Sequence, residues 1–202
     1  MKQLTFGTVL LVAVTTVLSI QVAAQDRPGW NAYWQTIGAT GTPDESAASR
    51  ILLQDSGWAE IKHEISSTTV RLRYDIPSLE GLSAPGDYDF TWAFRMWVRV
   101  RDNGPSARAL VSIKSLSKSS SGTVRTLGRF DSDQHTCESC SADPPDATGA
   151  FWALGPYLFD ESGIVTWFKP AFNVYWAEVQ LIKTAIDGRP GIHAVGVNIG
   201  DF

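Results

Sequence analysis

Residues 92–101 read WAFRMWVRVR and alternate between two kinds of side chain. The apolar set consists of Trp92, Phe94, Met96, Val98 and Val100. The other set carries all of the charge and consists of Ala93, Arg95, Trp97, Arg99 and Arg101. Successive side chains of a strand point to opposite faces, so this pattern predicts a β-strand with one face in a core.

A second strand is expected to return after a turn at residues 102–105. Asn103-Gly104 tolerates the positive φ of a tight turn, and Pro105 cannot donate to a strand ladder. Alternation then resumes with an apolar set and a more polar set. These sets are Ala109, Val111 and Ile113, against Arg108, Leu110, Ser112 and Lys114. Together the two segments predict a long β-hairpin over residues 92–116.

The rest of the chain repeats short apolar or alternating segments between Gly, Pro, Asn and Asp turns. Further strands are expected at 58–65, 69–76, 123–130, 172–184 and 192–199. A sustained apolar period of 3.6 residues is not found after residue 24. This arrangement predicts an all-β protein, an antiparallel β-sandwich of jelly-roll or Greek-key type.

Residues 1–24 have the pattern of a signal peptide, which leaves 25–202 as a single β-sandwich domain. Lys2 precedes an apolar run, and Val22-Ala23-Ala24 forms a small-residue cleavage site before Gln25. A transmembrane anchor at 7–24 is the alternative, but polar residues interrupt that run. We therefore expect export without a stable membrane span after cleavage, to a secreted, periplasmic or cell-surface location.

The charge balance argues against a nucleic-acid partner. The chain has 17 basic and 21 acidic residues, and cleavage would remove Lys2 alone among them. A net acidic chain does not suit bulk binding to phosphate backbones. A local basic patch remains compatible with this composition.

Cations gather between residues 68 and 130, where ten basic residues accompany only five acids. If these strands are neighbours, the acidic chain has one basic sheet face with an aromatic side chain. The expected ligand-binding residues are Arg71, Arg73, Arg95, Trp97, Arg99 and Arg101. Arginine pairs with carboxylate or sulfate through two parallel hydrogen bonds, so the expected partner is an anionic glycan or an acidic surface component.

A purely structural role for the same residues is the alternative. The cations could pair with Glu60, Glu64 and Glu178 on adjoining strands. Trp97, like Trp58 and Trp176, could form cation–π contacts instead of stacking on a sugar. The N-terminal segment with Trp30 and Trp34 could also cover this face, which would make the indoles part of a core.

The two cysteines, Cys137 and Cys140, are expected to form a local disulfide in an exported loop. A four-residue ring removes little chain entropy, so this bond would stiffen the loop more than the domain. Zinc bound by His135 and both cysteines with Asp131 or Asp133 is one alternative. Calcium bound by Asp131, Asp133, Asp143 and Asp146 is another. The favoured interpretation includes no metal and no cofactor.

Catalysis has little support in the sequence. His63 and His193 fall on expected inward faces, where core histidines are common. Glu60 and Glu64 share an expected strand face, and paired carboxylates are what a glycosidase needs. The sequence favours an exported, non-catalytic module that binds an anionic extracellular glycan. One alternative is a structural or assembly protein of the cell surface that docks through the same basic face, and the second alternative is a glycan-active enzyme.

Overall fold

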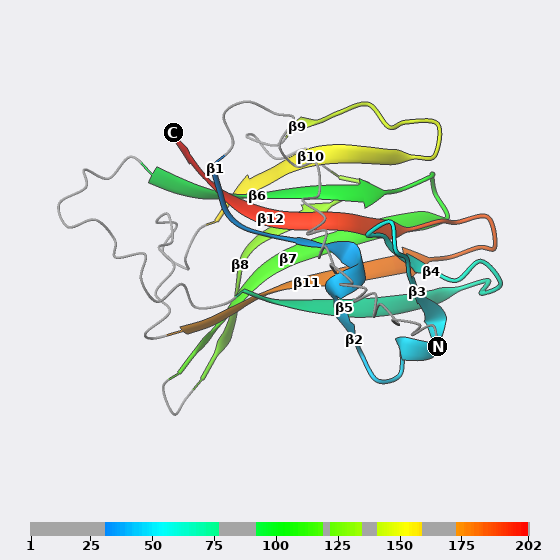
Figure 1. Cartoon of the computed structure of the whole chain (residues 1–202), viewed down its shortest axis with the longest axis horizontal. Helices are drawn as coiled ribbons and strands as arrows, with labels where there is room; N and C mark the ends of the chain where they lie inside the picture. Colours follow the sequence, from blue (N-terminus) through cyan, green and yellow to red (C-terminus); the bar gives the residue numbers. More distant parts are fainter. Residues whose placement is uncertain (1–30, 77–91, 119–121, 135–140, 159–172, 202) are drawn as a thin grey trace, which may run out of the picture.

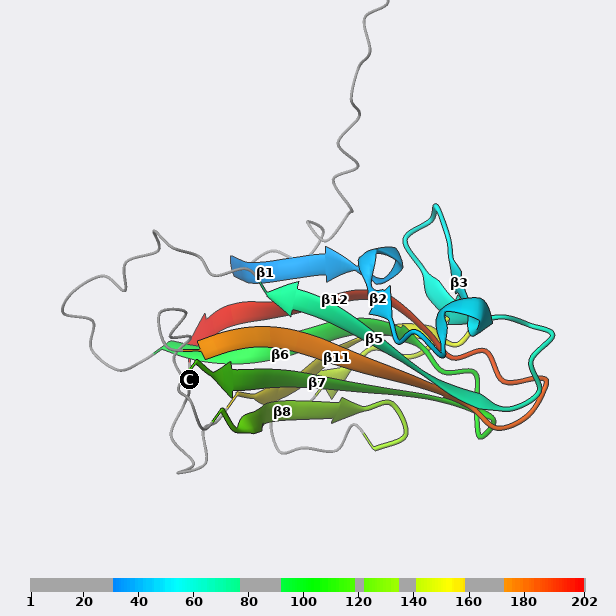
Figure 2. The ribbon, with the colours of Figure 1, turned by 90° about the horizontal axis from the view of Figure 1, so that it is seen from below.

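Two antiparallel β-sheets pack face to face, as Figures 1 and 2 show. The computed structural model describes residues 31–76, 92–118, 122–134, 141–158 and 173–201. The expected all-β antiparallel sandwich is therefore confirmed, while its jelly-roll or Greek-key type stays a prediction. The proposed signal peptide and both cysteines lie outside the described residues.

The larger sheet, called sheet A here, has seven strands in the order β3-β4-β12-β6-β10-β9, with β1 also paired to β12. Its strands are β1 (Asn31–Ile37), β3 (Ile51–Leu53), β4 (Ala59–Ile61), β6 (Trp92–Arg101), β9 (Ser141–Ala142), β10 (Ala150–Tyr157) and β12 (Gly191–Asp201). One edge of β12 is paired with β6 along its length. The opposite edge is shared, since β4 pairs with Gly191 and Ile192 and β1 pairs with residues 194–199.

The second sheet, called sheet B, has five strands in the order β2-β5-β11-β7-β8. Its strands are β2 (Thr42–Pro43), β5 (Thr68–Ile76), β7 (Ala107–Ser117), β8 (Val124–Asp131) and β11 (Asn173–Lys183). The central strand β11 pairs with β5 and β7 over most of its length. Two 3-10 turns, η1 (Gly38–Thr40) and η2 (Ala48–Arg50), complete the described elements. Among the residues that the structure describes, no helix is long and apolar enough to cross a membrane.

The hairpin expected over residues 92–116 is wrong, although both of its strands are present. β6 belongs to sheet A and β7 to sheet B, so residues 102–106 carry the chain from one sheet to the other. Alternation indicates only that one face of each strand is buried. Two successive strands show the same pattern whether they form a hairpin in one sheet or lie in opposite sheets of the sandwich. The turn residues have other partners here. Asp102 N–H donates to Gly149 O, and the Asn103 side chain reaches residues 187 and 189.

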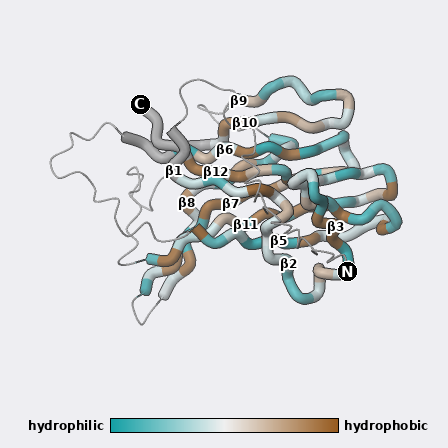
Figure 3. The backbone as a smooth tube through the Cα atoms, in the orientation of Figure 1, coloured by the Kyte–Doolittle hydropathy of each residue, from teal (hydrophilic) through white to brown (hydrophobic). Residues whose placement is uncertain are grey.

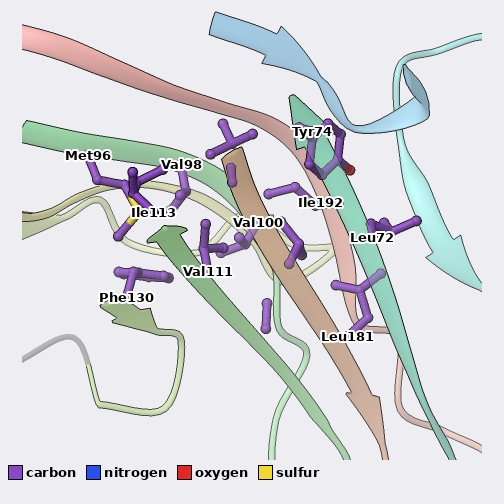
Figure 4. Close-up of a cluster of buried hydrophobic side chains, with 14 of the residues drawn as sticks. Leu72, Tyr74, Met96, Val98, Val100, Val111, Ile113, Phe130, Leu181 and Ile192 are labelled. Carbon is purple, nitrogen blue, oxygen red and sulfur yellow. The ribbon is translucent and has the colours of Figure 1, made fainter. Parts of the chain in front are cut away.

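The core lies between the sheets and contains Met96, Val98 and Val100 of β6, as alternation predicts, while the side chains of Trp92 and Phe94 lie outside the described part of the structure. Met96, Val98 and Val100 of β6 are fully buried, as are Val111 and Ile113 of β7. Figure 4 shows them meeting Leu72, Tyr74, Phe130, Leu181 and Ile192 from other strands of both sheets. Each such aliphatic side chain contributes about 1.5–3 kcal/mol through burial. Figure 3 shows the same alternation as brown and teal bands along the strands.

One strand is shorter than expected. The segment 58–65 was expected to be a strand throughout, but β4 ends at Ile61 and residues 63–64 form a turn. His63 is exposed in this turn, so its expected inward position is wrong. His193 is buried, and it occupies a register shift of β12 between Ile192 and Ala194.

Candidate functional site

The outer face of sheet A carries Arg95, Trp97, Arg99 and Arg101, which share one side of β6 as expected. Their exposure differs from the expectation. Trp97 is only 2% exposed, and the three arginines are half-buried. The solvent-reachable face expected around Trp97 is therefore wrong, and the alternative of a buried indole is correct.

A neighbouring glycine makes room for the Trp97 ring. Gly196 is paired with Trp97 across β12 and β6. A Cβ at position 196 would come within 2.5 Å of Trp97 Nε1 and Cζ2, which no real side chain tolerates. The indole therefore lies flat over the backbone of the central strand instead of projecting into solvent.

Arginines and tryptophans interleave on this face. The rings of Trp97 and Trp152 have centroids 5.4 Å apart. The Arg99 guanidinium carbon is 5.3 Å from the Trp152 centroid and 5.9 Å from the Trp58 centroid. The Arg101 guanidinium carbon is 4.4 Å from Trp58. These five residues are called the Arg–Trp row here.

Protein groups also engage two of the cations of this face. Arg101 Nη1 forms an ion pair with Glu60 Oε1, and both side chains are largely buried. Arg95 Nε donates to Gly155 O at 3.0 Å. The expected alternative, in which Glu60 pairs with a strand cation, is thus confirmed for Arg101. Glu64 lies in the turn after β4, so Glu60 and Glu64 do not share a strand.

His193 packs beside the Arg–Trp row. Its ring centroid is 5.1 Å from that of Trp58. Burial, together with the positive charge of Arg99, lowers the pKa of His193 below its ordinary value. A neutral imidazole is therefore favoured at this position, which suits a packing role.

Arg71 and Arg73 lie on the opposite side of the molecule. They belong to β5 of sheet B, whereas Arg95, Arg99 and Arg101 belong to β6 of sheet A. Val70, Leu72, Tyr74 and Ile76 fill the inward positions of β5, so Arg71 and Arg73 point outward and are exposed. The six expected binding residues thus form two groups on separate faces of the sandwich.

The outer face of sheet B is the more accessible of the two. Its cations come from three strands and are Arg71, Arg73, Arg108, Lys114 and Arg129. Its acids are Asp75, Asp131 and Glu178. We call this set the basic face. Strand pairing places Arg73, Glu178, Ser112 and Arg129 in one row across the sheet. Adjacent strands are about 4.8 Å apart, so the ends of that row are separated by about 14 Å.

Each acid of the basic face is held by one of its cations. Arg73 Nε lies 2.9 Å from Asp75 Oδ1, and Lys114 Nζ lies 2.7 Å from Glu178 Oε1. Arg108 binds both carboxylate oxygens of Asp131. Arg108 Nε also lies 3.2 Å from Oδ2 of Asp133, just beyond the end of β8, so five cations face four acids. Among the described residues, no ion pair engages Arg71 or Arg129.

The pKa shifts of these acids report the surrounding positive charge. Burial alone would raise the pKa of Glu178, but hydrogen bonds from Lys114 and Gln180 and the charges of Lys114 and Arg71 lower it overall. Burial alone would also raise the pKa of Asp131. Hydrogen bonds from Arg108 and from the Asp133 backbone, with the charge of Arg129, again lower the pKa overall. The field around both carboxylates is thus dominated by cations.

Trp176 is the tryptophan nearest to the basic face, and Arg73 covers it. The Arg73 guanidinium carbon is 4.6 Å from the ring centroid, and the indole is 7% exposed. An indole covered in this way supports the arginine above it. Ligand recognition on this face would therefore depend on charge and hydrogen bonds more than on ring stacking.

The metal sites considered from the sequence find no support in the described ranges. No group of three or more His, Cys, Asp or Glu side chains there could hold a metal ion. Asp131 and Asp133 instead pair with Arg108, and Asp146 accepts hydrogen bonds from Thr148 and from the Ala150 backbone. His135, Cys137 and Cys140 lie outside the described residues.

Comparison with known proteins yields no family. No protein-family model matches the chain, and no curated protein matches it significantly. The functional argument therefore rests on the geometry of the faces described above.

One member of the Arg–Trp row was missed in the sequence. Trp152 lies in β10, directly opposite Arg99 of β6. Residues 151–159 form an apolar run in the sequence, which by itself does not separate an inner from an outer face. Its finer alternation, with Phe151 and Ala153 in the core, indicates that Trp152 points to the outer face.

Proposed function

We propose that this chain is an exported, non-catalytic binding module whose ligand is an anionic extracellular glycan. The single observation that carries the proposal is the surplus of cations on the basic face. Arg71 and Arg129 are exposed there and lack an ion-pair partner among the described residues, in a chain with a net charge of −4. Export is the location expected from residues 1–24.

The basic face suits an extended polyanion because its charges lie on rigid strands. Arg71 and Arg73 are two residues apart on β5, and Arg129 lies three strands away. A linear glycan that crosses the strands could therefore meet arginines at both ends of the row. Gln180, opposite Arg71 on β11, supplies an uncharged hydrogen-bonding group between them. Fixed arginines pay less ordering entropy on binding than groups on mobile loops.

The Arg–Trp row is not proposed as the ligand surface. Its two cations, Arg99 and Arg101, are half-buried and bound to indole rings or to Glu60, and Arg95 beside them donates to a backbone oxygen. Displacing those partners for a ligand would cost more than it gains, because buried charges depend on them. Arg95, Trp97, Arg99 and Arg101 are thus assigned to stability.

The test is binding of the mature protein to an immobilised polyuronate and to dextran sulfate, with neutral dextran as the uncharged control. The double variant Arg71→Glu/Arg129→Glu should lose at least tenfold in affinity for the acidic polymers. Arg71→Glu alone should already weaken binding, whereas Lys62→Glu, which makes the same charge change as this single variant but outside the basic face, should lose little. Affinity should also fall with rising salt, because exposed charges are screened over about 10 Å at 0.1 M.

Two results would contradict the proposal. One is equal loss of affinity in Lys62→Glu and in Arg71→Glu, since these variants have the same net charge and overall charge alone would then decide binding. The other is equally strong binding to neutral dextran.

A second candidate is a subunit of a cell-surface assembly. The observation in its favour is the exposed pair Leu52 and Leu53, 41% and 43% accessible on the outermost strand β3 of sheet A. Exposed apolar side chains on an edge strand are typical of association surfaces. Sedimentation separates the candidates: a glycan-binding module stays monomeric, whereas a subunit associates, and Leu52→Lys/Leu53→Lys would prevent that association.

A further inference from the structure

A groove lies where three connections meet at one end of the sandwich. Its volume is about 960 Å³, and its walls come from residues 101–104, 145–149 and 187–189. A volume of this order is typical of small-molecule sites. Neither the Arg–Trp row nor the basic face includes this groove, apart from Arg101 at its inner end.

Side-chain hydrogen bonds hold these connections in place. Asn103 Nδ2 donates to Asp187 O at 2.9 Å, and Asn103 Oδ1 accepts from the Arg189 N–H at 2.6 Å. Asp146 Oδ1 accepts from the Thr148 N–H at 2.7 Å, which closes the second wall on itself. One asparagine thus ties the connection between the sheets to the turn that precedes β12.

Glycines bring the walls close together. Gly149 has φ +79°, and a Cβ there would lie 2.8 Å from Asp102 O. Gly104 has φ +120°, and a Cβ there would meet no atom within 4 Å, because it would point into open space. The walls are therefore built tightly against each other while the space above Gly104 is left free. Such preorganised backbone is what a binding site needs.

The charges of the groove balance. Arg101 and Arg189 are its cations, and Asp102 and Asp187 are its acids. Arg101 is committed to Glu60, and Asp102 accepts hydrogen bonds from Ser132 and from the Gly104 N–H. Asp187 and Arg189 are the exposed pair that remain for a ligand. One carboxylate and one guanidinium favour an uncharged ligand with several hydroxyl groups over an anion.

We infer that this groove is a second binding site, which takes one neutral sugar unit. The Asp187 carboxylate accepts hydrogen bonds from two adjacent hydroxyl groups, and the Arg189 guanidinium donates to ring or hydroxyl oxygens. Pro145 and Ala147 supply the apolar contact for the carbon face of the ring. The site is independent of the basic face, which selects negative charge.

The test is titration of the full mature protein with D-glucose, D-galactose, D-mannose and L-fucose, followed by NMR or calorimetry. At least one sugar should bind, with an affinity that changes less than twofold between low and moderate salt. Asp187→Asn should weaken it at least tenfold while leaving the thermal midpoint unchanged, because Asp187 holds the wall only through its backbone oxygen. Arg71→Glu/Arg129→Glu should leave sugar binding intact.

Three results would overturn the inference. The first is that none of the four sugars binds. The second is full binding by a folded Asp187→Asn variant. The third is D-glucuronate binding at least tenfold more tightly than D-glucose, which would show that the groove selects anions. Because the double variant of the basic face separates the two sites, failure here leaves the proposed glycan function standing.

Discussion

The Trp97 indole lies directly over Gly196 on the neighbouring strand, and the two residues fit only because position 196 has no side chain. The outer face of sheet A is therefore closely packed around Trp97. This contact leads to the first two predictions.

Gly196→Ala should destabilise the fold by about 1–3 kcal/mol, the usual cost of adding volume to a packed site. The added methyl group meets the Trp97 ring, so that ring or the backbone of β12 must move. Denaturant unfolding measures the change. The matched control is the same Gly196→Ala change made in a Trp97→Val background, where it should cost less because the smaller side chain leaves room for the methyl group. An unchanged unfolding midpoint in Gly196→Ala would contradict the close contact.

Trp97→Ala should cost about 3–5 kcal/mol of folding stability, as expected for truncating a buried large aromatic. Trp152 loses its ring partner at the same time. If the variant is refolded at low temperature, its affinity for acidic polysaccharide should equal that of the parent protein. A folded and stable variant that has lost glycan binding would instead indicate that the ligand binds at the outer face of β6.

The Glu60–Arg101 pair should show strong coupling in a double-mutant cycle. Glu60→Gln should destabilise by about 3–5 kcal/mol, because removal of one partner leaves the other charge buried without compensation. Glu60→Leu combined with Arg101→Met should cost much less than the sum of its single changes. Additive effects in urea unfolding would show that the two side chains act independently.

Stability should decrease as the solution is acidified below neutral pH, and His193 should account for part of the decrease. Burial and the charge of Arg99 lower its pKa in the folded protein, so the unfolded chain binds a proton more readily. The contribution of His193 is therefore fully present above about pH 6.5, the ordinary histidine value, and is lost as the pH falls toward the lower folded value. Thermal midpoints from about pH 7.5 to about pH 5 should vary less in His193→Phe. An equal pH dependence in that variant would mean that other groups cause it.

Much of the core could be predicted from local alternation. Met96, Val98 and Val100 face inward as expected, because the two-residue period of a strand decides which side each residue occupies. The burial of Trp97 could not be predicted in the same way. Its parity is that of the arginines, and only the packing of Trp152 and the absence of a side chain at Gly196 decide its exposure.

The sheet to which each strand belongs also could not be predicted from the local sequence. Arg71 and Arg99 have the same alternating surroundings, yet they lie on opposite faces of the molecule. The difference depends on pairing with β11 and β12, which are about a hundred residues away along the chain. The groove was missed for the same reason, since Asn103 and Arg189 meet only after both sheets have formed.

The positions of β11 and β12 also set the order in which this protein can assemble. These are the last two strands of the chain, yet β11 separates β5 from β7 and β12 separates β4 and β1 from β6. Before they are synthesised, the β7–β8 hairpin and the β6–β10 pair can form, but neither sheet can close. Folding that depends on such distant pairings is slow. We therefore expect the nascent chain to stay largely unfolded until β11 and β12 are both available.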